Sequence, residues 1–351
     1  MYPPSAKTHT DCFTIDLSIV GDCLLATEDS KDSSYSFSWY AKNKNPEYFF
    51  KKVSHIFQND DFTIANLENV LTDRPLKKRY KGEGAFWFKA PSNNANILNK
   101  GYIDVVSVTN NHTYDYGNEG YSDTIKALNK AGLLWGSEDK TLYLTKNDYT
   151  IAFIPASLYS SSQTKRIVER IKSASAKSDY QIVYFHGGKE AVYQPEAWKI
   201  NACHQLVDAG ADLVIGNHPH RLQPLEIYKG VNIIYSLGNF CFGGNNHMIS
   251  NRTIIYKIIL RIEDGKLLQE ETRLIPCYVQ DNSKYQNNWQ PDIITNEEER
   301  KLVIDFLFGK ASLPHTKTNN PDIIKINNYV KNSDNIEIDE NSGYILKYYT
   351  F

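Results

Sequence analysis

The segment ADLVIGNHPHRLQP, residues 211–224, combines an apolar run with two histidines, and this combination indicates which fold and which kind of site to expect. A short apolar run, typical of a buried strand, ends at Gly216, and His218 and His220 follow with one proline between them. A strand end needs only a turn residue, which Gly216 already supplies. Because histidine is a common metal ligand, two histidines at this point suggest that the end of the strand carries a site.

Similar apolar runs recur along the chain and alternate with helix-like stretches. Residues 118–136 and 194–212 show helical spacing of apolar side chains and include the helix stops Gly132 and Gly210. Residues 253–279 contain two strand runs around Asp264-Gly265, which predicts a hairpin. The alternation predicts an α/β layered fold with an antiparallel hairpin near its end. The other predicted strands are 13–21, 62–69, 103–110, 149–155, 180–187 and 231–240.

The overall composition excludes several classes of protein. A formal net charge of −2 argues against nucleic acid as a partner and against attraction to anionic lipid. No stretch approaches the roughly 20 apolar residues that span a bilayer, and the N-terminus lacks the pattern of a signal peptide. The five cysteines are far apart and odd in number, which favours free thiols. We therefore expect a cytoplasmic protein without a membrane segment.

Side chains that can bind a metal stand at the ends of five predicted strands. In α/β sheets, ligands bind beyond the carboxyl ends of the strands, so residues distant in sequence can converge there. Four of the nine histidines occupy such positions. The residues are Asp22, Glu68, Asn111 with His112, His186, and His218 with His220.

Each of these residues also has an ordinary structural explanation. Asp22 follows a glycine and fits a turn, Glu68 fits a helix start or a surface position, and Asn111 fits a local turn. His186 fits a hydrogen-bonded position at a sheet edge. The repetition of metal-binding residue types at five strand ends favours the metal site over these separate explanations.

The mixture of residue types indicates which ions would bind and what they would do. Histidines, a carboxylate and an amide oxygen suit Mn, Fe or Zn, whereas an all-oxygen cage would suit Mg or Ca. One or two divalent ions are expected, and a pair about 3.5–4 Å apart would hold a phosphoryl group and activate a water. His112, beside Asn111, is then the candidate general acid. Asp115 would orient it, although a turn or helix-cap role is an equal alternative.

The full set of motifs resembles a known family. GD after the first strand, NLE, NNH with DYG, a strand followed by His-x-Gly, GNHPH and YSLGNF occur within about residues 15–245 in the order seen in CapA-type proteins. That family is associated with bacterial capsule and poly-γ-glutamate synthesis and is similar to calcineurin-like metallophosphatases. The resemblance implies a four-layer α/β/β/α sandwich with a two-metal rim.

The resemblance also implies how the ligands are shared. Asp22 and His220 would bind one metal. Asn111, His186 and His218 would bind the other, Glu68 would occupy the bridging position, and His112 the acid position. Classical metallophosphatases open with Asp-x-His, whereas Leu24 stands in the histidine position here, so the first metal would have one ligand fewer.

Basic and polar residues near these motifs are candidates for binding substrate. Arg221 follows His220 directly, and a guanidinium can hold phosphate with two hydrogen bonds. Lys77 belongs to the basic segment 72–91, which is either a solvated loop or a cover for the metal rim. Asn110, beside Asn111, is a third candidate.

We therefore expect a metal-dependent, phosphoesterase-like hydrolase that acts on a phosphate-containing small molecule. The alternative is a non-hydrolytic component of capsule or poly-γ-glutamate synthesis that binds an anionic polymer or an acyl phosphate. A structural metal site is disfavoured because such sites are normally closed and rich in cysteine. The expected organisation is one large domain, residues 13–280, with a C-terminal extension, residues 281–351, that contributes one helix packed on the body.

Overall fold

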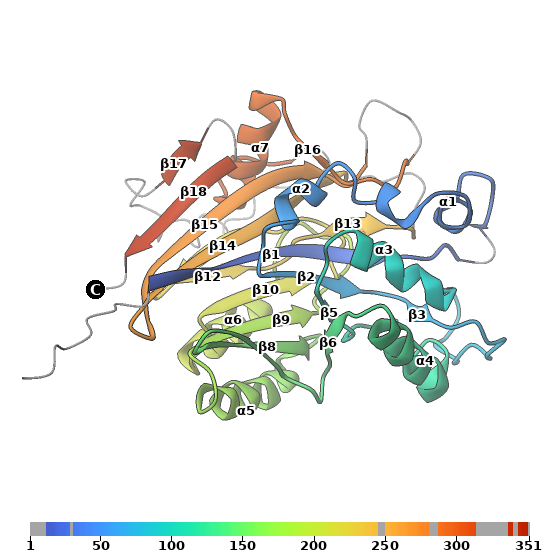
Figure 1. Ribbon diagram of the computed structural model, residues 1–351, viewed down its shortest axis with the longest axis horizontal. Helices are drawn as coiled ribbons and strands as arrows, with labels where there is room; N and C mark the ends of the chain where they lie inside the picture. The colour runs from blue at the N-terminus through green and yellow to red at the C-terminus, as the bar shows by residue number, and fades with distance from the viewer. Residues whose placement is uncertain are drawn as a thin grey trace, which may run out of the picture.

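Two β-sheets lie face to face in the computed structural model (Figure 1). The structure describes residues 12–28, 31–244, 250–280 and 287–313, together with the backbone of two further strands at 336–339 and 343–349. Within this part of the chain, no helix is long and apolar enough to cross a membrane. The five cysteines are all free thiols.

The larger sheet combines parallel strands with the predicted hairpin. Its order is β17-β18-β15-β14-β1-β2-β5-β6, with β13 paired to β1 and β16 paired to β15. β1, β2, β5, β6 and β13 are parallel, whereas β14 and β15 form the antiparallel hairpin. The strands are β1 (Cys12–Leu24), β2 (Phe62–Leu67), β5 (Val105–Ser107), β6 (Leu134–Gly136), β13 (Asn239–Phe242), β14 (Arg252–Glu263), β15 (Lys266–Tyr278), β16 (Asp292–Ile293), β17 (Ile336–Asp339) and β18 (Gly343–Tyr349).

The smaller sheet has the order β11-β12-β10-β9-β8-β7. Its four central strands run parallel, and the two edge strands pair antiparallel to their neighbours. The strands are β7 (Leu142–Lys146), β8 (Tyr149–Ser157), β9 (Tyr180–His186), β10 (Leu213–Asn217), β11 (Leu225–Tyr228) and β12 (Val231–Ile234). β3 (Val70–Leu71) and β4 (Lys89–Ala90) form a separate two-stranded pair.

Three apolar clusters show that the layers are helix, sheet, sheet and helix. One cluster lies between the sheets and joins Ile19 and Ile64 of the larger sheet to Ile182 and Ile215 of the smaller one. A second cluster lies between the outer face of the larger sheet and the helices that cover it. A third lies between the outer face of the smaller sheet and its helices. The four-layer α/β/β/α sandwich is therefore confirmed. The helices are α1 (Phe37–Asn43), α2 (Ser54–Phe57), α3 (Ala95–Lys100) and α4 (Gly117–Lys130) on the larger sheet, and α5 (Thr164–Ser175) and α6 (Ala197–Asp208) on the smaller.

The predicted elements are confirmed with shifted ends, with one exception. Residues 231–240, predicted as one strand, contain two, because the chain turns at Gly238, which has positive φ: β12 ends at Ile234 in the smaller sheet, and β13 begins at Asn239 in the larger sheet. The hairpin turns at Asp264 and Gly265, both with positive φ, as a two-residue turn requires. Gly132 and Gly210 also have positive φ and lie two residues beyond the last residues of α4 and α6. Helix α5 was not among the predicted elements, although its buried Ile167, Ile171 and Ala174 follow helical spacing.

The extension contributes the expected helix, α7 (Glu297–Leu307), which packs into the cluster between the sheets through Val303 and Leu307. Asn296 caps it, with its side chain accepting from the backbone N–H of Glu299. β16 and β18 both pair with β15. The division of the chain at residue 280 stays a prediction.

Candidate metal centre

The predicted ligands meet between the two sheets, at the carboxyl ends of their parallel strands. β1, β2 and the loop after β5 contribute Asp22, Glu68 and Asn111 from the larger sheet. β9 and the loop after β10 contribute His186, His218 and His220 from the smaller one. The parallel order β1-β2-β5 and the pairing of β9 with β10 make these ends adjacent, which is the placement expected for ligand sites in α/β sheets.

A glycine allows the first of these strand ends to form. Asp22 lies at an irregularity in β1, and its backbone N–H donates to the carbonyl oxygen of Gly238 at 2.9 Å. A Cβ atom on Gly21 would lie 2.0 Å from that same oxygen. Only glycine therefore fits at position 21, and the GD motif is a steric requirement as well as a source of a carboxylate.

Three ligand atoms converge on Nε2 of His186. Its Nε2 lies 2.9 Å from Asn111 Oδ1, 3.1 Å from His218 Nδ1 and 3.4 Å from Glu68 Oε1. Two ligands that each lie about 2.1 Å from one ion are about 3.0–3.4 Å apart in octahedral or tetrahedral geometry. The spacing of these atoms therefore fits a single divalent ion among them.

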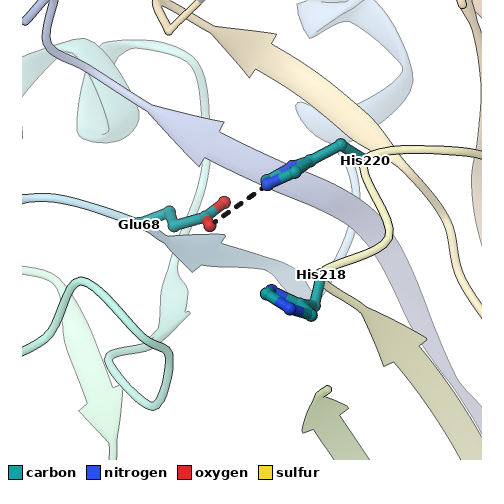
Figure 2. A group of neighbouring side chains, drawn as sticks. All are labelled: Glu68, His218 and His220. Atoms are coloured by element: carbon teal, nitrogen blue, oxygen red, sulfur yellow. Dashed lines mark ion pairs between the residues drawn. The ribbon is translucent and has the colours of Figure 1, made fainter. Parts of the chain in front are cut away.

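A second set of atoms surrounds Asp22 and His220. His220 Nδ1 lies 3.5 Å from Asp22 Oδ2, and its Nε2 lies 3.7 Å from Glu68 Oε1. Figure 2 shows Glu68 directed toward His220, with His218 on the same loop as His220. Among the described residues, two groups have spacings suited to a metal, Glu68 with His218 and His220, and Asp22 with Glu68 and His186. Because Glu68 belongs to both groups, it occupies a shared position.

The carboxylate of Glu68 is the feature that these protein contacts leave unexplained. The residue is fully buried, and neither of its oxygens has a hydrogen-bond partner within the described chain. Burial of an ionised carboxylate without hydrogen bonds is costly, and buried charges are normally paired or bind metals. The imidazole nitrogens of His186 and His220 that face its Oε1 are 3.4 and 3.7 Å away, longer than a usual hydrogen bond. This donor set fits a divalent metal.

The His-Pro-His segment reaches both groups through an unusual backbone. A proline favours an extended conformation in the residue before it, but His218 has φ of 99° and His220 has φ of 52°. Both values lie where residues other than glycine are uncommon, so the segment stores backbone strain. The backbone N–H of His218 donates to Asp22 Oδ2 at 3.2 Å, which helps to hold this turn against β1.

Gly216 has a different role from the turn that the sequence suggested. It lies inside β10, and a Cβ atom there would be 2.3 Å from the carbonyl oxygen of Tyr235 and 2.4 Å from the ring of Phe185. The glycine therefore permits close packing of neighbouring strands, and the chain turns later, at His218.

The carboxylates and histidines of this centre shift one another's pKa values. Burial opposes protonation of His186, but Glu68 and Asp22 raise its pKa to about 9, and the same carboxylates raise the pKa of His220 to about 10. Burial and the two charged histidines lower the pKa of His218 to about 2. Burial opposes ionisation of Asp22, yet His186 and His220 hold its pKa below the ordinary value. The neutral imidazole of His218 is already in the form that binds metals.

Leu24 has the environment expected of an apolar replacement for a ligand. It is fully buried in the cluster between the larger sheet and its helices, paired in register with Phe242. The ring of Phe242 also lies 5.0 Å from that of His220. Position 24 therefore supplies no nitrogen ligand, and an apolar ring, that of Phe242, lies against His220.

His112 and Asp115 form a buried pair beside the metal ligands. Asp115 Oδ2 lies 2.8 Å from His112 Nδ1 and also accepts from the backbone N–H of Phe88. Because a carboxylate can only accept, Nδ1 carries the proton, and Nε2 is left for other groups. Lys81 donates to Asp115 Oδ1 and lies 3.3 Å from His112 Nδ1. Asp115 is thus bound to a cation as well as to the histidine, a contact absent from the sequence interpretation.

The three predicted substrate-binding residues have different surroundings. Asn110 donates to Asn66 Oδ1 and the carbonyl oxygen of Leu67, and accepts from the backbone N–H of His112. Arg221 is half-buried and donates to the carbonyl oxygen of His220. Lys77 is exposed, whereas the side chain of Lys81, in the same segment, donates to Asp115.

Two asparagines join the centre that we did not predict as site residues. Asn66 Nδ2 donates to Asp22 Oδ1 at 2.8 Å and lies 3.3 Å from His186 Nδ1. Asn239 Oδ1 lies 2.8 Å from His220 Nδ1. Both belong to motifs quoted above: Asn66 is the first residue of NLE, and Asn239 of YSLGNF pairs in register with Asp22. Such contacts orient ligands and are a usual part of metal sites.

The fold and the site together define a four-layer α/β sandwich protein with a candidate metal centre between its sheets. The family described as bacterial capsule synthesis protein PGA_cap matches residues 16–244, and the chain belongs to that family. This match confirms the resemblance to CapA-type proteins. Its range nearly coincides with residues 15–245, which contain the motifs of the resemblance.

Relatives of known name are moderately similar. The PGA biosynthesis protein CapA of Bacillus subtilis (strain 168) is 28% identical over 262 residues, covering 68% of this chain and 66% of that protein. The capsule biosynthesis protein CapA of Bacillus anthracis is 27% identical over 256 residues, covering 62% of each. The chain thus spans less than two thirds of the length of these relatives. Among solved structures, a purple acid phosphatase from yellow lupin seeds aligns with 88% of this chain and 57% of its own, at a TM-score of 0.39 and 9% identity.

Proposed function

We propose that this protein is a metal-dependent hydrolase of phosphoesters or phosphoanhydrides. The observation that carries the proposal is the buried carboxylate of Glu68, which has no hydrogen-bond partner among the described residues and faces histidines of both ligand groups. One or two ions of Mn, Fe or Zn are the proposed cofactors. Bound ions would supply charge for the phosphoryl oxygens and lower the pKa of a bound water.

The ligands and their supports have distinct proposed roles. Asp22, Glu68, Asn111, His186, His218 and His220 hold the metal, as the spacing of their donor atoms favours. Asn66 and Asn239 orient Asp22 and His220. Asn110 keeps the loop after β5 in place through its bonds to β2, and so positions both Asn111 and His112.

His112 is the proposed general acid. Its Nδ1–H donates to Asp115, which selects the tautomer and orients the ring. Nε2 then holds the proton that passes to the leaving oxygen of the ester. Lys81 fixes Asp115 from the other side, and the ring of Phe88 lies edge-on to the imidazole at 4.7 Å. Arg221 and the exposed Lys77 are proposed to attract the phosphate group of a small-molecule substrate.

The experiment that tests this proposal starts with protein made without added metal. Metal analysis before and after addition of Mn, Fe or Zn measures binding, and a screen of phosphomonoesters, phosphodiesters and nucleotides measures turnover. We expect binding of at least one of these ions and metal-dependent release of phosphate or of an alcohol from at least one class. Metal binding without hydrolysis of any class would contradict the hydrolase.

Metal binding should also depend on pH. In the metal-free protein the pKa values of about 9 for His186 and about 10 for His220 mean that both carry protons at pH 7. A metal must displace these protons, so its apparent affinity should rise as the pH increases from 7 to 9. Calorimetry in buffers of different ionisation enthalpy should record release of about two protons at pH 7. Almost no proton release at pH 7 would contradict the protonated state of His186 and His220 in the metal-free protein.

A second function is favoured by family membership and by the basic segment that contains Lys77 and Lys81. The relatives are described as proteins of PGA and capsule biosynthesis, and one from Mycobacterium tuberculosis as a "probable polyglutamine synthesis accessory protein". A non-hydrolytic component would bind an anionic polymer or an acyl phosphate. Binding of poly-γ-glutamate that survives removal of metal, in a protein without turnover, would support it over the hydrolase.

A further inference from the structure

Tyr159 lies beside the metal centre and has no role in the functions proposed above. It follows β8, one strand along from β9 in the smaller sheet. Its ring centroid is 5.1 Å from that of His218, with the rings almost perpendicular, and 6.3 Å from that of His186. The phenol therefore contacts two ligands that belong to the same ion in the proposed arrangement.

The hydroxyl group of Tyr159 is buried without a partner. The residue as a whole is half-buried, but its oxygen is shielded from solvent and has no hydrogen bond within the described chain. A buried tyrosine hydroxyl usually finds a partner. Burial raises the pKa of Tyr159 well above its ordinary value, and the charges that raise it further are led by Glu68 and Asp22. The unpartnered phenol and the unpartnered carboxylate of Glu68 thus belong to one region.

The backbone around Tyr159 is held firmly, which gives the ring a defined position. The N–H groups of Tyr159 and Ser160 both donate to Oε1 of Gln163, at 2.6 and 3.2 Å. The preceding N–H, of Leu158, donates to the carbonyl oxygen of His186 at 3.0 Å. The backbone of Tyr159 is thus tied to the end of β9, the strand that supplies His186, and its ring packs against His218 and His186.

We propose that Tyr159 is a further catalytic residue, whose hydroxyl donates a hydrogen bond to a phosphoryl oxygen of the substrate beside His186 and His218. The inference rests on the proposed phosphoester chemistry and adds to it a donor from the protein. A fixed donor in a site shielded from water stabilises negative charge that develops on oxygen in the transition state. The missing partner of the hydroxyl is then the substrate itself.

The test compares Tyr159→Phe with the native full-length chain, both loaded with the metal found to bind. The change removes one oxygen and leaves the ring against His218. We expect kcat/KM for the best phosphoester to fall about 10²-fold, with metal content unchanged. Binding of inorganic phosphate to the metal-loaded protein, measured by calorimetry, should weaken about tenfold. The melting temperature should not fall, because no hydrogen bond within the protein is lost.

Tyr235→Phe is a matched control. Tyr235 is fully buried and its hydroxyl donates to Glu226, away from the metal ligands. This change should lower the melting temperature and leave phosphate affinity as it is.

Three outcomes would overturn the inference. Unchanged kcat/KM and phosphate affinity in Tyr159→Phe, with native turnover intact, would refute the role of Tyr159 and leave the proposed hydrolase standing. Loss of metal from this variant would make Tyr159 a ligand instead of a donor. Failure of the native protein to bind metal or phosphate at all would overturn both proposals.

Discussion

Replacement of His218 by alanine is expected to remove both metal binding and hydrolysis. His218 Nδ1 lies 3.1 Å from His186 Nε2, and the imidazole is neutral at pH 7 because its pKa is about 2. Loss of a residue that hydrogen-bonds to a metal ligand costs about 10- to 100-fold in metal affinity. Loss of the ligand itself should therefore cost at least about 100-fold. The ion contributes several kcal/mol to the transition state, and kcat/KM should therefore fall about 10³-fold.

The backbone at His218 calls for a second variant. Its φ of 99° strains most residues, and alanine there could destabilise the loop as well as remove the ligand. His218→Asn is better suited to positive φ and should lose metal while keeping its melting temperature. His204→Ala is a matched control, since that histidine pairs with Glu226 on the opposite side of the smaller sheet. Native metal content and turnover in both His218 variants would refute the site.

Replacement of His112 by asparagine should slow hydrolysis according to the leaving group. A general acid contributes about 10²- to 10⁴-fold when the departing oxygen needs a proton. An alkyl phosphate should therefore lose about that much in kcat. A nitrophenyl phosphate, whose leaving group departs without a proton, should lose only several-fold. Single-substrate kinetics on the two esters, with metal content measured in parallel, checks the prediction.

The ratio between the two esters separates acid catalysis from other roles of His112. Equal slowing of both would mean that His112 binds or positions substrate, which would contradict the proposed acid. Asp115→Asn is a weaker test, because Asp115 also binds Lys81 and the backbone N–H of Phe88, and its loss should lower stability too. His112→Asn leaves that pair of contacts in place.

Much of this centre could be predicted from local patterns. Strands such as β9 and β10 are runs of apolar residues, and the polar residue that ends each run is visible in the sequence. The rule that parallel strands present ligands at their carboxyl ends then groups Asp22, His186 and His218 without any knowledge of the sheet order. Helix α5 was not predicted, although its apolar residues follow a regular helical pattern that the sequence alone shows.

Other features depend on contacts between segments far apart in the sequence, which no local pattern encodes. Lys81 meets Asp115 because a loop between β3 and β4 folds back onto the loop after β5. Asn239 meets His220 because β13 pairs with β1 rather than continuing the smaller sheet. Which lysine of a basic segment reaches the site, and which asparagine orients a ligand, are decided by packing.

The His-Pro-His segment shows which features the local sequence determines and which features depend on the tertiary structure. Its residue types and its position after an apolar run determine that two imidazoles stand at the end of a strand, and the proline prevents that strand from continuing. The positive φ values of both histidines, and the contact of both with Asp22 of β1, arise only when β10 lies beside β9 and opposite β1. Local chemistry selects the ligands, whereas the free energy that holds a strained turn comes from the two sheets packed around it.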